Sequence, residues 1–169
     1  MSNWVEPTRS IPLTWGTYTE RYIAGLVLII GGAVQIQGAN TWALSVIVIG
    51  GIAHILGWAI LPAQGWRRIV AVVPSVGGVF VVLAGPNVVV VLAVVLACWV
   101  LVRQRPARSY VVVLLPVASG LVFSQTMREY SGMPAALLIS AIVLFGSAWL
   151  ARLIAVSAPT GSRIPSEVR

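Results

Sequence analysis

The stretch IVAVVPSVGGVFVVLAGPNVVVVLAVVLACWVLV, residues 69–102, decides how this chain folds. It lies between Arg68 and Arg103 and runs for 34 residues without a charged side chain. Because a helix that crosses a bilayer needs roughly 17–25 apolar residues, the stretch is too long for one crossing and barely long enough for two. The turn-forming residues Gly85-Pro86-Asn87 interrupt it near its middle. We therefore predict two short transmembrane helices, with a re-entrant pair that does not reach the far side of the membrane as the alternative.

The chain as a whole has the composition of a membrane protein. Of its 169 residues, 59% are hydrophobic and 9% charged, whereas soluble domains are about 45–50% apolar and about 25% charged. The same length criterion gives six helices, and their short connections make successive helices antiparallel neighbours. The predicted helices occupy residues 19–37, 42–62, 69–85, 88–102, 109–126 and 134–156. The predicted fold is therefore an all-α integral membrane bundle of six transmembrane helices.

Two flanking segments differ from this transmembrane domain, which we place at residues 18–157. Residues 1–17 hold tryptophans between prolines and are predicted to lie as an irregular segment at the cytoplasmic interface. Residues 158–169 are rich in Ser, Pro, Gly and Arg and are predicted to form a disordered tail. The first twenty residues contain no apolar core, so we expect the first helix to act as its own uncleaved membrane signal.

Local signals mark several helix ends. Thr17 and Glu20 have the spacing of a capping box, which places the start of the first helix near Tyr18. Ser109 is predicted to cap the fifth helix, and Pro134 suits the first turn of the sixth.

The arginines indicate how the bundle is oriented. All eleven cations of the chain are arginine, and ten of them lie on one predicted side of the membrane. These ten are Arg9, Arg21, Arg67, Arg68, Arg103, Arg105, Arg108, Arg152, Arg163 and Arg169. With only Arg128 on the other side, the positive-inside rule predicts that both termini are cytoplasmic. The positions of the arginines at helix ends indicate contact with membrane lipids and not with nucleic acid. The bias toward Arg, Ala, Val and Gly is typical of a GC-rich bacterium, so we expect the protein in a bacterial plasma membrane.

His54 is the single histidine of the chain and the centre of the candidate site. It lies near the middle of the second predicted helix, where Gly50 and Gly57 share its face and let another helix approach. Ser75 and Ser119 are predicted at a similar depth, so the three side chains would form a polar layer in mid-membrane. One interpretation is a proton-responsive group or ligand contact, because ionisable residues inside bilayers are costly and often functional. The other is a neutral histidine that bonds to a backbone carbonyl or a serine and holds helices together.

Further candidates lie on the first helix and on the glycine-rich faces. Gln35, near the outer end of the first helix, is predicted either to contact a solute or to form an interhelical hydrogen bond. Glycines let helices approach closely in lipid, so a set of them is predicted to form packing surfaces within the bundle or in an oligomer. This set comprises Gly31, Gly32, Gly50, Gly57, Gly77, Gly78 and Gly120.

The residue content argues against catalysis. A membrane enzyme usually needs a nucleophile with a base, paired carboxylates or metal ligands. The four acidic residues are all Glu and lie outside the predicted helices or, for Glu20, in the first turn of one. The single Cys98 and His54 give no metal-binding spacing. We therefore expect no enzyme activity, no cofactor and no metal.

Two functions from different classes follow. The first is a non-catalytic accessory or scaffold subunit of a membrane complex, which acts through helix contacts with another membrane protein. The second is a small-solute or lipid binder or carrier, or a self-associating pore, with the polar layer around His54 at its centre. With six predicted helices, 169 residues and cytoplasmic termini, the chain resembles, in size and topology alone, the substrate-binding subunits of energy-coupling-factor transporters. That resemblance implies a solute pocket built with outer loops, whereas the outer connections at 38–40 and 86–87 are only a few residues long.

Overall fold

The computed structural model describes residues 6–13, 15–40, 42–127 and 129–157, and over these ranges the ordered elements are all helical. Six helices overlap the six predicted segments, so the predicted all-α class and the number of helices are confirmed. In chain order the elements are η1 (Pro7–Ser10), α1 (Tyr18–Gly38), α2 (Leu44–Ile60), α3 (Gly65–Val81), η2 (Val82–Ala84), η3 (Pro86–Val91), α4 (Leu92–Val102), η4 (Ala107–Val113), α5 (Leu114–Thr126), η5 (Tyr130–Gly132) and α6 (Met133–Val156), where η denotes a 3-10 helix. Arg128 and the predicted disordered tail at 158–169 lie outside the described residues.

The predicted capping box at the start of α1 is confirmed. The backbone N–H of Glu20 donates to Thr17 Oγ1 at 3.3 Å, and the N–H of Thr17 donates to Glu20 Oε2 at 2.9 Å. Each side chain thereby satisfies a backbone donor that the first turn of a helix leaves free. Pro134 lies in the first turn of α6, as predicted.

The predicted cap of the fifth helix is wrong. Pro106 precedes η4 in an extended conformation, so this helix begins at Ala107 and Ser109 lies inside it. The Ser109 hydroxyl donates instead to the carbonyl of Ala151 on α6, at 3.2 Å. A side chain expected to end a helix therefore ties two helices together.

The charge-free stretch folds as a hairpin with its turn at the predicted position. Gly85 has φ +124°, a backbone conformation that residues with a Cβ rarely adopt. Pro86 then opens η3, which leads directly into α4, and the continuous helix Pro86–Val102 packs beside α3. Valine runs occupy η3 and the end of η4, where β-branched side chains lower helix propensity and short 3-10 turns are common.

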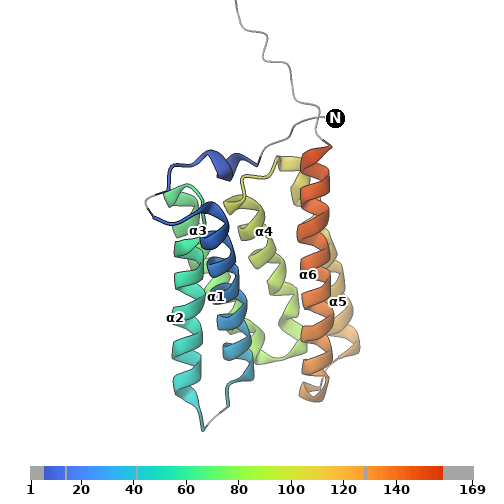
Figure 1. Ribbon diagram of the computed structural model, residues 1–169. Helices are drawn as coiled ribbons and strands as arrows, with labels where there is room; N and C mark the ends of the chain where they lie inside the picture. Colours follow the sequence, from blue (N-terminus) through green and yellow to red (C-terminus); the bar gives the residue numbers. More distant parts are fainter. Residues whose placement is uncertain (1–5, 14, 41, 128, 158–169) are drawn as a thin grey trace, which may run out of the picture.

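The six helices lie side by side and run along a common direction (Figure 1). α1 packs on α2, α3 packs on α4, and η3 and α4 lie between α3 and the pair α5 and α6. The short helix η1 lies across the end of the bundle at which α1 begins and α6 ends (Figure 1). The arginines in the described part of the chain gather at this same end, which we call the arginine end.

The most extensive contact between two helices lies between α1 and α2, and it depends on glycine. A Cβ added at Gly32 would lie 2.5 Å from the carbonyl oxygen of Gly50 and 2.6 Å from the amide nitrogen of His54. A Cβ at Gly57 would lie 2.7 Å from the carbonyl oxygen of Gly25. Backbone therefore touches backbone along this pair, and that close approach brings His54 against α1.

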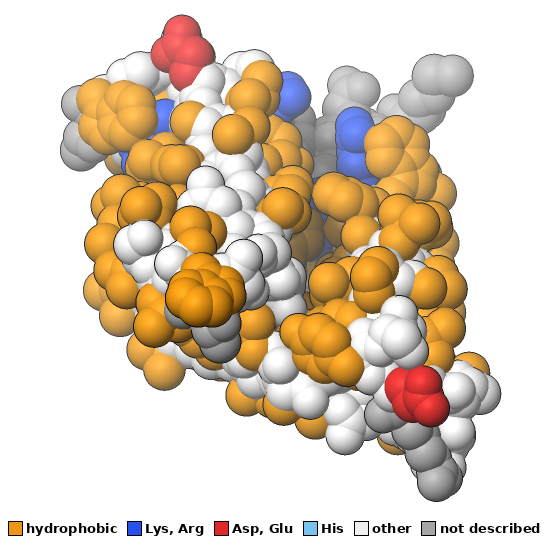
Figure 2. Space-filling model, turned by 90° about the horizontal axis from the view of Figure 1, so that it is seen from below, with side chains coloured by type: hydrophobic (Ala, Val, Ile, Leu, Met, Phe, Trp, Pro, Cys, Tyr) orange, Lys and Arg blue, Asp and Glu red, His pale blue; other side chains and the backbone are white. Residues whose placement is uncertain are grey.

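The outer surface of the bundle is apolar, which is the reverse of a soluble protein. Large hydrophobic side chains are exposed on its flanks, among them Val34 at 64%, Ile69 at 72% and Val73 at 76%. Figure 2 shows hydrophobic side chains over most of the face seen from below. Four helices are long and apolar enough to cross a membrane, namely Tyr18–Gly38, Gly65–Ala84, Ala107–Thr126 and Tyr130–Val156, while Leu44–Ile60 and Pro86–Val102 are shorter apolar helices. These features describe a multi-pass membrane protein.

Candidate functional site

The polar centre of the bundle consists of His54, Trp58 and Ser75. His54 and Trp58 are four residues apart on α2 and share a face, and Ser75 faces them from α3. The imidazole and the serine are 0% exposed and the indole is 1% exposed. The sequence predicted His54 and Ser75 at a similar depth, and the structure brings them into direct contact.

Hydrogen bonds join the three side chains to one another and to α1. His54 Nδ1 lies 2.9 Å from the carbonyl oxygen of Ile29, and Nε2 lies 2.9 Å from Ser75 Oγ. The indole N–H of Trp58 lies 2.9 Å from Ser75 Oγ and 3.2 Å from His54 Nε2. Since a carbonyl can only accept, Nδ1 is the donor, and a neutral imidazole then accepts at Nε2 from the serine hydroxyl. Every polar side-chain atom of the polar centre therefore forms a hydrogen bond inside the bundle.

Ser119, the third predicted member of the polar layer, and the candidate Gln35 lie elsewhere. Ser119 Oγ donates to the carbonyl of Pro116 within its own helix, at 3.2 Å. Gln35 is exposed near the C-terminal end of α1, and the nearby Gln37 reaches α3 instead, where its Nε2 donates to the carbonyl of Val79 at 2.7 Å. Ser147 on α6 is buried, and its hydroxyl has no hydrogen-bond partner among the described residues. Of the four predicted site residues, His54 and Ser75 meet, whereas Ser119 and Gln35 remain apart.

The glycines predicted to pack helices divide into three groups. Gly32, Gly50 and Gly57 lie in the contact between α1 and α2. Gly78 lies against Val95 of α4, and Gly120 is pressed against the backbone of Val90 in η3. Added side chains at Gly31 and Gly77 would meet no heavy atom within 4 Å, so these two glycines face away from the other described helices.

A second polar cluster, at the arginine end, was not foreseen from the sequence. Glu6 forms ion pairs with Arg103 and with Arg105, the latter at 2.9 Å. The hydroxyl of Tyr18 donates to the same carboxylate at 3.2 Å, and it also lies 3.1 Å from the Thr8 hydroxyl. Burial lowers the pKa of the Arg105 guanidinium, and the Glu6 carboxylate opposes that shift. This Glu6 cluster fixes the N-terminal segment to the connection between α4 and η4.

Aromatic side chains connect the Glu6 cluster to the polar centre. The Arg103 guanidinium lies over the rings of Tyr22, Trp99 and Tyr18, at 4.6, 5.7 and 5.8 Å from their centres, within the range of cation–π attraction. Trp99 in turn packs against Trp58, with ring centres 6.4 Å apart. Because these residues come from three helices, no local pattern in the sequence pairs them.

The described residues contain no group of three or more His, Cys, Asp or Glu side chains placed to hold a metal ion. The polar centre offers hydrogen bonds between helices, and Trp58 makes aromatic contacts with His54 and with Trp99. Comparisons with protein-family models, with curated proteins and with solved structures found no match to this chain.

Proposed function

We propose that this chain is a non-catalytic polytopic membrane protein that acts through helix contacts, as an accessory or scaffold subunit of a membrane complex. The observation that carries the proposal is the closure of the polar centre. His54 and Ser75 are 0% exposed, so no space the size of a water molecule adjoins the imidazole. A carrier or pore built on His54 needs such a space for its solute, and a catalytic histidine must reach a substrate atom. His54 is therefore best explained as a link between α1, α2 and α3.

The outside of the bundle offers faces on which a partner helix can pack. Gly31 on α1, Gly77 on α3 and Gly146 on α6 each have no neighbouring heavy atom within 4 Å of an added Cβ. In lipid, small residues allow the close backbone approach that drives helix association. Figure 2 also shows a hollow in the surface, with hydrophobic side chains along its border. Open glycine backbone and apolar flanks are the features expected of a subunit that packs against another membrane protein.

The proposed topology has all six helices crossing the bacterial plasma membrane, with the arginine end in the cytoplasm. Arg67 and Arg68 lie in the first turn of α3, while Arg103 and Arg105 follow α4. The positive-inside rule favours the cytoplasm for this end, and an even number of crossings gives both termini the same side. Anionic lipid headgroups on that face are suitable partners for the arginines.

Purification of the tagged, full-length protein from its native membranes in mild detergent tests the proposed function. We expect one membrane protein to be retained at equal stoichiometry, as measured by quantitative mass spectrometry. Recovery of a homo-oligomer alone, or of a monomer that holds a small molecule, would contradict the accessory-subunit function.

Three variants locate the contact and serve as controls for one another. Gly31→Leu, Gly77→Leu and Gly146→Leu each place a large side chain in open space on a different helix. We expect at least one of them to release the partner, while the thermal unfolding of the isolated protein stays unchanged in all three. Retention of the partner in all three variants would exclude these faces as the contact.

A further inference from the structure

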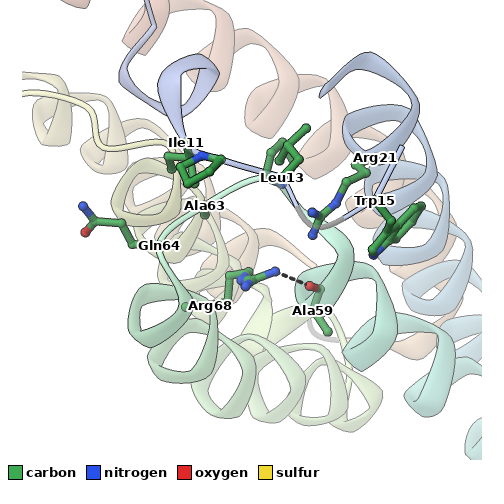
Figure 3. A pocket seen from close by; sticks show the side chains of 11 residues that line it. Ile11, Leu13, Trp15, Arg21, Ala59, Ala63, Gln64 and Arg68 are labelled. Carbon is green, nitrogen blue, oxygen red and sulfur yellow. Dashed lines mark hydrogen bonds between the residues drawn. The ribbon is translucent and has the colours of Figure 1, made fainter. Parts of the chain in front are cut away.

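A pocket of about 390 Å³ opens at the arginine end, away from the polar centre. The N-terminal segment contributes Leu13 and Trp15 to its lining, and α1 contributes Arg21. The connection between α2 and α3 contributes Gln64, and Arg68 comes from α3. Figure 3 shows both arginine side chains extending into the same space from different helices.

Both arginines are held in place by the C-terminal end of α2. Arg21 is 5% exposed, and its Nε donates to the carbonyl of Ile60 at 3.0 Å. Arg68 Nη1 donates to the carbonyl of Ala59 at 2.6 Å, the bond drawn in Figure 3. A guanidinium carries five N–H donors in a rigid plane, so these bonds orient each plane and leave donors for a ligand. The ring of Trp15 lies 4.9 Å from the Arg21 guanidinium carbon and covers it from one side.

Among the described residues, the lining holds two positive charges and no carboxylate. Glu20 adjoins Arg21 in the sequence, but its carboxylate is engaged by the backbone of Thr17 in the capping box. No side chain caps the N-terminus of α3, whose first residue Gly65 also lines the pocket. The free N–H groups and the dipole of such a helix end favour an anion. Two guanidinium groups, an uncapped helix start and the absence of an acidic side chain all favour the same kind of ligand.

We propose that this pocket binds a phosphate ester, held by the guanidinium groups of Arg21 and Arg68 and flanked by Trp15. Arginine binds phosphate oxygens through paired, charge-assisted hydrogen bonds. The apolar side chains of Ile11 and Leu13 border the same pocket, which suits a phosphate that carries a glycerol and acyl chains. The shared chemistry is that of a phosphate ester, and its source is either an anionic phospholipid headgroup or a soluble phosphate. The site is separate from the proposed contact with a partner helix and does not depend on it.

Calorimetric titration of the purified, delipidated full-length protein tests the site. The probes are short-chain phosphatidylglycerol, short-chain phosphatidylcholine with the same acyl chains, and glycerol 1-phosphate. We expect phosphatidylglycerol to bind roughly tenfold more tightly than phosphatidylcholine, because one charge-assisted contact contributes about a factor of ten. Weaker binding of glycerol 1-phosphate assigns a lipid headgroup, and equal or tighter binding assigns a soluble phosphate. The proposal is overturned if none of the three probes binds. It is also overturned if the two lipids bind equally and glycerol 1-phosphate does not bind.

Matched variants separate this pocket from the general charge of the arginine end. Arg68→Gln removes one of the two arginines proposed to bind the phosphate. Arg108→Gln removes an arginine outside the pocket lining, which likewise donates to a helix carbonyl, that of Ile154 at 2.7 Å. We expect roughly a tenfold loss of affinity in Arg68→Gln and no change in Arg108→Gln. Equal weakening in both variants would show that the whole arginine end attracts the ligand, and would overturn the site.

A second variant keeps both arginines and guards against misfolding. Gln64 is exposed at the pocket rim, directly before α3. Gln64→Glu introduces a carboxylate into the pocket lining, while a negative charge at a helix N-terminus supports folding. We expect the thermal unfolding temperature to be unchanged or higher and ligand binding to fall roughly tenfold. Unchanged affinity in this folded variant would overturn the proposal.

Discussion

The carboxylate of Glu6 is paired with the guanidinium of Arg103, and the two side chains are only 15% and 4% exposed. One acidic side chain thereby holds the N-terminal segment against the end of α4. The aromatic rings of Tyr18, Tyr22 and Trp99 surround the same guanidinium. Removal of the carboxylate leaves a buried positive charge with aromatic rings but without its anion.

Glu6→Gln is expected to destabilise the protein and to release the N-terminal segment. Loss of one partner from a buried ion pair costs roughly 3 kcal/mol, because the remaining charge stays buried without compensation. Thermal unfolding and limited trypsin cleavage at Arg9 measure the two effects. Glu129→Gln, which removes an exposed carboxylate at the opposite end, is the control and should leave both unchanged. Equal behaviour of the two variants would contradict a role for Glu6 in holding the segment.

His54→Ala and Ser75→Ala are each expected to destabilise the bundle by roughly 2–4 kcal/mol, through lost hydrogen bonds and, for histidine, a cavity. The two side chains are 2.9 Å apart, so the double variant should cost less than the sum of the single ones. Chemical unfolding in detergent measures all four free energies. Strict additivity would show that the hydrogen bond between them contributes nothing to stability.

The neighbouring glycines 31 and 32 are expected to respond oppositely to alanine. Gly32→Ala places a methyl group 2.5 Å from the Gly50 carbonyl oxygen, which forces α1 and α2 apart and lowers stability by roughly 1–3 kcal/mol. Gly31→Ala adds the same atom in open space and should be neutral, or stabilising by up to about 1 kcal/mol, because alanine favours helix. Thermal unfolding of the two variants compares them directly. Equal destabilisation would contradict the described contact between α1 and α2.

Cysteine labelling is expected to distinguish two full crossings at 69–102 from a re-entrant hairpin. Asn87 lies in the turn after Gly85, and Ala107 begins η4 at the arginine end; both are exposed. In a Cys98→Ala background, a membrane-impermeant thiol reagent added outside intact cells should label Asn87→Cys and not Ala107→Cys. Labelling of Asn87→Cys only after the membrane is opened would exclude the six-crossing topology.

Much of the fold could be predicted from the sequence because its signals are local. The absence of charge between Arg68 and Arg103, together with Gly85, sets the α3–α4 hairpin. Thr17 and Glu20 mark the start of α1 through their own side chains. The predicted cap at Ser109 was wrong because the extended Pro106 sets the start of that helix. The Ser109 hydroxyl donates instead to a carbonyl of α6.

The sites were less predictable because they depend on contacts between distant segments. The sequence predicted His54 and Ser75 at a similar depth, whereas their direct contact depends on how α2 and α3 face each other. The separation of Ser119 from them depends on which way α5 faces, and the sequence does not specify this. The pairing of Glu6 with Arg103 and the facing of Arg21 with Arg68 arise only when separate helix ends are brought together.

The short length of α2 and α4 bears on the membrane itself. α2 has 17 residues, which at 1.5 Å per residue span about 26 Å, less than the roughly 30 Å of a typical hydrocarbon layer. In the proposed topology this hydrophobic mismatch is met by local thinning of the bilayer around α2, at a modest cost for each ångström. The protein should therefore prefer lipids with shorter acyl chains. A thicker bilayer would place the bundle under mechanical stress at α2.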